Sequence, residues 1–268
     1  MLVALGLAVV PARAAALPAR VTLTRLACGT VTIPDLDFLS DSFAFSGKAK
    51  TVTVSCYLIR HGDLYMLWDA GLPLSRLGAG QRSNGGGLAR LERSLIDQLR
   101  QIGIAPERVG IVALSHYHAD HTGQLASFPS ARVLIGRSDA AIVRGEGAAF
   151  NLDRSQFPAG ANLDPVDGDR DVFGDGSIIM LATPGHTPGH HSLLVRLASG
   201  PVLLTGDLWH FAEQRPIRGV PKINTSRAET LASIDRIEQV AANLHAKIVL
   251  GHEPADIVLL PPFPREAE

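Results

Sequence analysis

Residues 115–121 read Ser115-His116-Tyr117-His118-Ala119-Asp120-His121, and this stretch decides how the rest of the chain is interpreted. It places three imidazoles and one carboxylate within six positions. Imidazole and carboxylate groups are ligands of zinc and of other first-row metals. A hydrophobic core disfavours polar side chains placed side by side, because burying them without partners costs free energy. The stretch therefore predicts a metal site.

A short apolar run, residues 111–114, directly precedes this stretch, and three later apolar runs also lead to a potential ligand. These pairs are 178–182 with His186, 202–204 with Asp207 and 248–250 with His252. Short apolar runs bounded by Gly or Pro are typical of buried strands. If the carboxyl ends of these strands lie together, all the potential ligands gather at one edge of the fold.

The geometry of the His-rich stretch predicts two metal positions. In an extended segment, side chains two residues apart point to the same side, so His116 and His118 can hold one metal. Asp120 and His121 follow as the chain turns, and they can reach a second position.

The His-rich stretch and three later segments resemble the motifs of the metallo-β-lactamase superfamily. These segments are Thr183-Pro184-Gly185-His186-Thr187-Pro188-Gly189-His190, Thr205-Gly206-Asp207 and Gly251-His252, in the order that the family shows. The resemblance extends over about residues 21–260. It implies an α/β (α+β) fold, a four-layer αββα sandwich with a dinuclear metal site at one edge. We expect residues 20–268 to form a single domain of this kind.

The resemblance also implies a complete ligand set for two divalent metal ions. The first ion would be bound by His116, His118 and His186, the second by Asp120, His121 and His252, with Asp207 bridging both. These ligand types make zinc the default metal, while iron, cobalt and manganese also suit such a site. His190 and His191 are expected to support the ligands rather than to bind a metal.

Two bridged cations indicate a hydrolase. Metal binding lowers the pKa of a bridging water toward roughly 7 and yields a hydroxide nucleophile at neutral pH. Asp120 is expected to orient this hydroxide and to pass a proton to the leaving group. No Ser or Cys nucleophile motif competes with this interpretation.

Within the superfamily, the chain resembles the N-acyl-homoserine lactonases. The resemblance is carried by Cys56-Tyr57-Leu58, Trp68-Asp69-Ala70-Gly71, residues 184–192 and residues 203–207. It implies that the metal-bridging hydroxide opens the lactone ring of an N-acyl-homoserine lactone. Many of these enzymes carry a Tyr three residues after the bridging Asp, where it hydrogen-bonds the substrate carbonyl. Here His210 occupies that position, and its imidazole can donate the same hydrogen bond.

Two alternatives stay open at this point. The first is another hydrolase on the same scaffold: a general lactonase or esterase, an organophosphate hydrolase or a β-lactamase-like enzyme. The second is a non-catalytic protein that binds a metal or a signal molecule. The complete ligand set argues against the second, because a binding module has no need for an open, bridged pair of metals.

The charge balance and the N-terminus bear on partners and location. The formal net charge is -1 and no Lys- or Arg-rich run is present, which argues against nucleic acid as a partner. Residues 1–10 are almost wholly apolar and small residues follow them, so residues 1–16 resemble a secretory signal peptide. This segment is too short to span a bilayer. We expect a periplasmic or secreted protein without stable membrane insertion, whose partner is the small lactone; its oligomeric state is left open.

A hairpin and two cysteines lie upstream of the His-rich stretch. Residues 51–59 and 64–68 are expected to pair as a hairpin, with His61 solvated in its turn. Cys28 and Cys56 could form a disulfide in an exported protein. Buried free thiols are the favoured interpretation, because both cysteines stand in apolar, strand-like contexts.

Two helices and an apolar channel complete the predictions. Leucine spacing predicts a helix over 88–102, and a second helix is expected over 227–244, where Ser226 and Glu229 form a capping box. An acyl chain would need an apolar channel. The candidates for its walls are Leu72, Pro73, Leu74, Phe150, Phe157, Trp209, Phe211, Ile217 and Val220.

Overall fold

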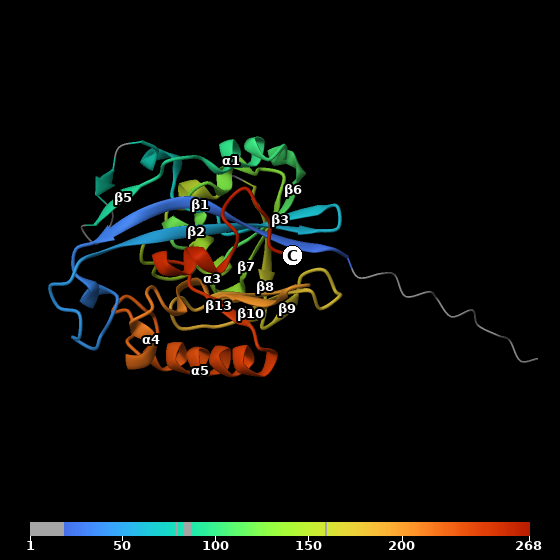
Figure 1. The fold of residues 1–268 in the computed structure, drawn as a ribbon. Helices are drawn as coiled ribbons and strands as arrows, with labels where there is room; N and C mark the ends of the chain where they lie inside the picture. Colours follow the sequence, from blue (N-terminus) through green and yellow to red (C-terminus); the bar gives the residue numbers. More distant parts are fainter. Residues whose placement is uncertain (1–18, 79, 83–86, 159) are drawn as a thin grey trace, which may run out of the picture.

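The computed structural model describes residues 19–78, 80–82, 87–158 and 160–268 of the chain (Figure 1). The predicted signal peptide, residues 1–16, lies outside this described part. Two β-sheets occupy the centre of the molecule, and helices cover their outer faces (Figure 1). Among the described helices, none is both long enough and apolar enough to cross a membrane.

The first sheet contains eight strands in the described part of the chain, in the order β4-β5-β1-β2-β3-β6-β7-β8. In chain order they are β1 (Val21–Ile33), β2 (Lys50–His61), β3 (Leu64–Trp68), β4 (Gln81–Arg82), β5 (Leu88–Arg90), β6 (Val109–Ala113), β7 (Arg132–Gly136) and β8 (Asn162–Val166). Strands β3, β6, β7 and β8 run parallel, so their carboxyl ends lie at the same edge of the sheet.

The second sheet contains five described strands, in the order β13-β12-β11-β10-β9. They are β9 (Arg170–Asp171), β10 (Ile178–Ala182), β11 (His191–Leu197), β12 (Gly200–Leu204) and β13 (Lys247–Val249). Strands β12 and β13 are parallel, and β10 runs antiparallel to β11, which in turn runs antiparallel to β12. Strands β10, β12 and β13 therefore point in the same direction. The four apolar runs predicted as strands are confirmed in β6, β10, β12 and β13, although β6 ends before Leu114 and β13 before Leu250.

The α-helices are α1 (Leu95–Gln101), α2 (Ala119–Thr122), α3 (Arg137–Val143), α4 (Gln214–Ile217) and α5 (Arg227–Leu244). Short 3-10 helices lie at Leu36–Phe38, Leu74–Arg76, Pro106–Arg108, Leu125–Ser127, Arg154–Gln156, Gly206–Leu208 and Pro254–Leu259. In Figure 1, α1 lies on one side of the sheets and α5 on the opposite side.

Buried side chains define the layers. Trp68 of the first sheet and Met180 of the second belong to one apolar group between the sheets. Leu99 of α1 belongs to a second group, on the outer face of the first sheet. Ile237 of α5 and Leu203 of β12 belong to a third, on the outer face of the second sheet. The four-layer αββα sandwich is therefore confirmed.

The predicted hairpin is confirmed, as is one of the two predicted helices. The predicted start of the other helix is wrong. Helix α5 covers 227–244 as expected, and strands β2 and β3 pair antiparallel. Residues 88–90 form β5, however, and α1 begins only after Ser94, whose hydroxyl accepts the Asp97 N–H at 3.1 Å. A side-chain cap, rather than leucine spacing, determines where this helix begins.

His61 is not the solvated turn residue that the sequence suggested. It is the last residue of β2, and its ring stacks on Phe173 with centroids 4.1 Å apart. Its Nε2 also lies 2.7 Å from a carboxylate oxygen of Asp175. Both partners come from the loop before β10. This loop is far from His61 in the sequence, so local sequence patterns do not reveal the contact.

Cys28 and Cys56 form a disulfide, so the prediction of free thiols is wrong. Their Cα atoms lie 5.8 Å apart, within the range that a disulfide spans. Strands β1 and β2 are antiparallel neighbours, with Cys56 opposite Leu26, and Cys28 lies in a register irregularity between Ala27 and Thr30. Strand register depends on this irregularity, and composition alone does not reveal it.

Candidate metal centre

Every predicted ligand follows a strand, and the structure brings all seven together. His116 and His118 lie in the loop after β6, and Asp120 and His121 lie in α2, which continues that loop. The other three follow β10, β12 and β13 and are His186, Asp207 and His252. The first sheet therefore supplies one part of the site and the second sheet the other.

Asp207 lies at the centre of this arrangement, and its two carboxylate oxygens face different neighbours. Oδ2 lies 3.2 Å from His186 Nε2 and 3.7 Å from His116 Nε2. Oδ1 lies 3.2 Å from the Nε2 atoms of both His121 and His252. One side chain thus separates two sets of potential ligands while contacting both.

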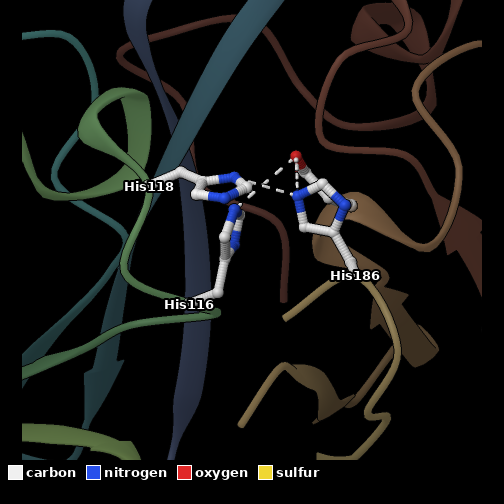
Figure 2. A group of neighbouring side chains, drawn as sticks. His116, His118 and His186 are labelled. Atoms are coloured by element: carbon white, nitrogen blue, oxygen red, sulfur yellow. Dashed lines mark hydrogen bonds and ion pairs between the residues drawn. The ribbon is translucent and has the colours of Figure 1, made fainter. Parts of the chain in front are cut away.

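We call His116, His118 and His186 the first group. With Asp207, their candidate ligand atoms all lie within 4.8 Å of one another, and all four residues are buried. His186 Nε2 lies 3.0 Å from His118 Nδ1. Figure 2 shows the three imidazoles converging on one small volume from two separate loops.

We call Asp120, His121 and His252 the second group. Their candidate ligand atoms also lie within 4.8 Å of one another. An oxygen of Asp120 lies 3.8 Å from His121 Nε2 and 3.7 Å from His252 Nε2. The Asp120 side chain is 22% exposed, whereas both histidine side chains are 3% exposed, so the carboxylate is the open end of this group.

The residues of both groups fit bound cations. His116 Nε2, His121 Nε2 and Asp207 Oδ1 are buried, and none makes a hydrogen bond within the described structure. A buried polar atom without a partner costs about 1–3 kcal/mol. Imidazole nitrogens and carboxylate oxygens turned toward one another in this way are suited to divalent metal ions of the first transition row.

The two groups differ in their electrostatics. Burial and the neighbouring His121 hold the pKa of His116 well below its usual range, and burial with His186 does the same for the pKa of His118. Burial also opposes charge on His121, but Asp207 and Asp69 outweigh it and raise the pKa of His121 well above its usual range. His116 and His118 are therefore held as neutral imidazoles, the form that binds metals, while carboxylates dominate the second group.

Backbone and carboxylate partners orient the second group. An oxygen of Asp69 lies 2.9 Å from His121 Nδ1, and the other accepts the Ser115 N–H at 2.7 Å. His252 Nδ1 donates to the Thr53 carbonyl at 2.7 Å. These contacts turn both Nε2 atoms toward Asp207. Asp69 directly follows β3, as the predicted ligands follow their strands, and this position is a sequence signal that points to it.

Different partners orient the first group. The side-chain oxygen Oδ1 of Asn224 lies 2.7 Å from His186 Nδ1, so the Nε2 atom of His186 is left to face the centre of the site. The Ser115 hydroxyl lies 2.9 Å from His116 Nδ1. Asn224 stands in an irregular segment 38 residues from His186, and no local pattern would have identified it.

His190 contacts the backbone of a predicted ligand through one ring nitrogen and the backbone of Thr183 through the other. Its Nε2 accepts the backbone N–H of Asp207 at 3.0 Å, and its Nδ1 donates to the Thr183 carbonyl at 3.0 Å. His191 Nδ1 and Nε2 lie 2.8 Å and 3.0 Å from the backbone carbonyl oxygens of Gly189 and Gly168. Neither ring belongs to a group of potential metal ligands among the described residues.

His210 lies at the edge of the site. Its Nε2 lies 3.1 Å from Asp207 Oδ2, and its ring stacks on His252 with an interplanar angle of 10°. Its Nδ1 is buried and makes no hydrogen bond in the described structure. Asp207, His210 and His252 also form a set whose ligand atoms lie within 4.8 Å of one another. His210 is therefore in reach of anything bound between the two groups.

A cavity of about 330 Å³ opens beside the site and is lined by Asp120, Asp207 and His210 among others. Leu72, Pro73 and Phe150, three of the predicted channel residues, lie in its walls. Further apolar wall comes from side chains that the sequence analysis did not name: Val31, Ile33, Phe38, Leu39, Val52, Ala89, Leu152 and Ile223. These residues come from strands β1, β2 and β5 and from several separate segments outside the strands, and each segment contributes only one or two of them, too few for a recognisable pattern.

The remaining channel predictions are wrong. Trp209, Phe211 and Val220 are buried but do not line this cavity, and Phe157 packs against the core beside α1 and α3. Ile217 and Leu74 are exposed. Large apolar side chains near a site more often fill the core than form a binding surface.

Comparisons with known proteins agree with this geometry. A family model described as the metallo-beta-lactamase superfamily matches residues 49–252. The N-acyl homoserine lactonase AttM of Rhizobium johnstonii is 30% identical over 229 residues, covering 78% of this chain and 85% of AttM.

Two solved structures share the fold. A Bacillus thuringiensis AiiA variant with N-decanoyl-L-homoserine bound at its active site superposes with a TM-score of 0.81 at 23% identity, over 93% of this chain and 100% of that one. AidC, a dizinc quorum-quenching lactonase in complex with a product, gives a TM-score of 0.66 at 18% identity, over 89% of this chain and 90% of AidC.

Proposed function

Since this chain belongs to the metallo-beta-lactamase superfamily, we propose that it is a metal-dependent hydrolase that opens the lactone ring of N-acyl-homoserine lactones. The observation that carries the proposal is the pair of ligand groups around Asp207, at the end of a cavity with apolar walls. The similarity to AttM, whose name describes this activity, supports the choice of substrate.

The proposal assigns two divalent cations, zinc by default, to the two groups. The first group would hold one cation and the second group the other, with Asp207 shared because its two oxygens face opposite sides. When bound, two such cations polarise the lactone carbonyl and make water a nucleophile at neutral pH. The description of AidC as a dizinc quorum-quenching lactonase supports this arrangement.

Two side chains are proposed to act on the reacting atoms. Asp120 is the open carboxylate of the second group and lines the cavity, so it can take a proton from the attacking water. It can then deliver that proton to the ring oxygen as the ester bond breaks. His210 Nε2 faces the same space, and its N–H would donate a hydrogen bond to the lactone carbonyl oxygen.

The cavity accounts for the rest of the substrate. An N-acyl-homoserine lactone joins a polar ring to an apolar tail. In the cavity, polar side chains such as Asp120 and His210 lie next to walls formed by Val31, Ile33 and Val52. The ring would bind beside Asp120, and the tail would lie along the walls from β1 and β2.

The decisive experiment measures bound metal and then hydrolysis by proton release. The panel contains short- and long-chain N-acyl-homoserine lactones, a simple lactone, a cephalosporin, a thioester and paraoxon. We expect about two metal ions per chain and turnover of the homoserine lactones. Turnover of the cephalosporin or paraoxon without any lactone would instead support another hydrolase on this scaffold. Lactone binding without turnover by the metal-loaded protein would support a non-catalytic binding protein.

We also propose that the protein is exported. The buried disulfide between Cys28 and Cys56 supports this, because disulfides persist in oxidising compartments and are rare in the cytosol. The apolar segment at residues 1–10 supports it as well. Fractionation of cells that express the chain, with N-terminal sequencing of the product, tests the proposal. An uncleaved protein confined to the cytosol would refute it.

A further inference from the structure

One buried carboxylate in the fold has no part in the proposed chemistry. Asp139 lies in the first turn of α3, and its relative exposure is 0%. Burial raises the pKa of its carboxyl group to about 6, although hydrogen-bond donors oppose that rise. A buried carboxylate is costly unless it is well hydrogen-bonded, so its partners indicate its purpose.

The partners of Asp139 lie in both loops that carry the first group. One oxygen accepts the Thr187 O–H at 2.7 Å, and the other accepts the Gly189 N–H at 2.7 Å. The backbone N–H of Tyr117 also donates to this carboxylate. Thr187 directly follows His186, and Tyr117 lies between His116 and His118. One side chain therefore connects the loop after β6 to the loop after β10.

The surrounding backbone leaves little room for adjustment. A Cβ atom added to Gly136, just before α3, would lie 1.9 Å from the Gly189 carbonyl oxygen. A Cβ atom added to Gly189 would lie 2.6 Å from the Asp139 nitrogen. The start of α3 is thus pressed against the loop that follows His186, and the hydrogen bonds of Asp139 hold that contact in register.

We propose that Asp139 is a positioning residue that fixes the three imidazoles of the first group relative to one another. This inference rests on the proposed function in one respect, namely that the first group binds a metal. Asp139 contacts no ligand side chain of the second group through these hydrogen bonds, whereas Asp69 lies 2.9 Å from His121 in that group. Asp69 therefore contacts a ring of the second group directly, although its other oxygen accepts the N–H of Ser115 beside His116. Asp139 instead acts through the two loops of the first group.

The test compares Asp139→Ala with Asp69→Ala in the full chain. The affinity of each of the two Zn²⁺ binding steps is measured by competition with a chromophoric chelator. Residues that orient metal ligands change affinity by roughly 10–100-fold when removed. We expect each variant to weaken one step by such a factor and the double variant to weaken both.

The Co²⁺-loaded proteins identify which half has changed. Paramagnetically shifted imidazole N–H protons are counted by NMR, since the first group has three imidazoles and the second has two. Asp139→Ala is expected to lose the signals of the three-imidazole site, and Asp69→Ala those of the other. Asp139→Asn, which keeps an acceptor oxygen for Gly189, should lie close to the wild type.

Two further variants guard against a general loss of structure. Thr187→Val removes one hydrogen bond of Asp139 with little change in volume, and it should weaken the same step by a smaller factor. Asp171→Ala is the control, because Asp171, the exposed last residue of β9, accepts N–H bonds at 2.9 Å and 2.6 Å from Gly174 and Gly176 of the following loop. It should bind two Zn²⁺ as the wild type does.

The proposal is overturned if Asp139→Ala and Thr187→Val both keep wild-type affinities, or if Asp139→Ala weakens the site that Asp69→Ala weakens. If Asp139→Ala does not fold, Thr187→Val decides alone. A wild-type protein that binds two Zn²⁺ without hydrolysing lactones would refute the proposed activity and leave the role of Asp139 to be judged by these affinities.

Discussion

The first and second groups are built from similar ligands but differ in what surrounds them. The first group is three buried imidazoles contributed by loops of both sheets, and burial holds the pKa values of His116 and His118 low. The second group includes Asp120, whose side chain is 22% exposed and lines the cavity. A buried set of imidazole nitrogens suits tight metal binding, whereas an exposed carboxylate is available to exchange protons with a substrate.

The strongest way to break this comparison is to remove what the two groups share. Asp207→Asn replaces the carboxylate whose oxygens face His186 on one side and His121 on the other. We expect loss of metal from both groups and of lactonase activity together, beyond the roughly 10–100-fold effects of supporting residues. Metal analysis and proton release measure both. Full activity in this variant would show that Asp207 does not bridge.

Asp120→Asn should separate the two groups. The change removes the exposed carboxylate but leaves the three imidazoles of the first group untouched. General acid–base groups contribute about 10²–10⁴-fold to rate, so kcat should fall within that range. The tighter of the two Zn²⁺ binding steps should stay close to wild type in a chelator competition. An unchanged kcat would refute the proton-transfer role.

His210→Ala tests the comparison further, because it is expected to remove a contact with the substrate and to leave both groups of metal ligands in place. Removing one donor to a developing oxyanion costs about 10²–10³-fold in kcat, and bound metal should not change. His210→Tyr offers a hydroxyl in place of the imidazole and should restore part of the rate. His245→Asn is a control, since His245 is an exposed histidine with φ 51° at the end of α5. Kinetics equal to wild type for His210→Ala would make it a bystander.

Asn224→Ala is expected to have the smallest effect, because it removes the hydrogen-bond partner of a single ligand, His186. The side-chain oxygen Oδ1 of Asn224 lies 2.7 Å from His186 Nδ1, so removing this side chain lets the His186 ring rotate. We expect about a 10-fold weakening of Zn²⁺ binding at the first group, the lower end of the range for such residues. Asn224→Asp keeps the acceptor and should recover the affinity. A loss confined to the second group would contradict the assignment.

Local patterns predicted much of this molecule correctly. Helix α5 was predicted within its observed bounds because a capping box and an apolar stripe lie next to each other in sequence. The leucine spacing predicts a start for α1 that is too early, because the spacing continues upstream of the Ser94 cap into β5. The sequence does not reveal the partners of His61, and it leaves the pairing of Cys28 with Cys56 open, because both depend on which segments become neighbours.

What the sequence determined by itself is the chemistry of the site: histidines and carboxylates placed directly after apolar strands. This pattern can be recognised in the sequence because parallel strands end at the same edge of a sheet. The position of a residue at the end of a strand therefore predicts where it lies in the fold. Only the tertiary structure decided how those ligands divide around Asp207 and which residues hold them. The supports Asp69, Asn224 and Asp139 act across contacts between distant segments, and such contacts exist only once the two sheets have packed.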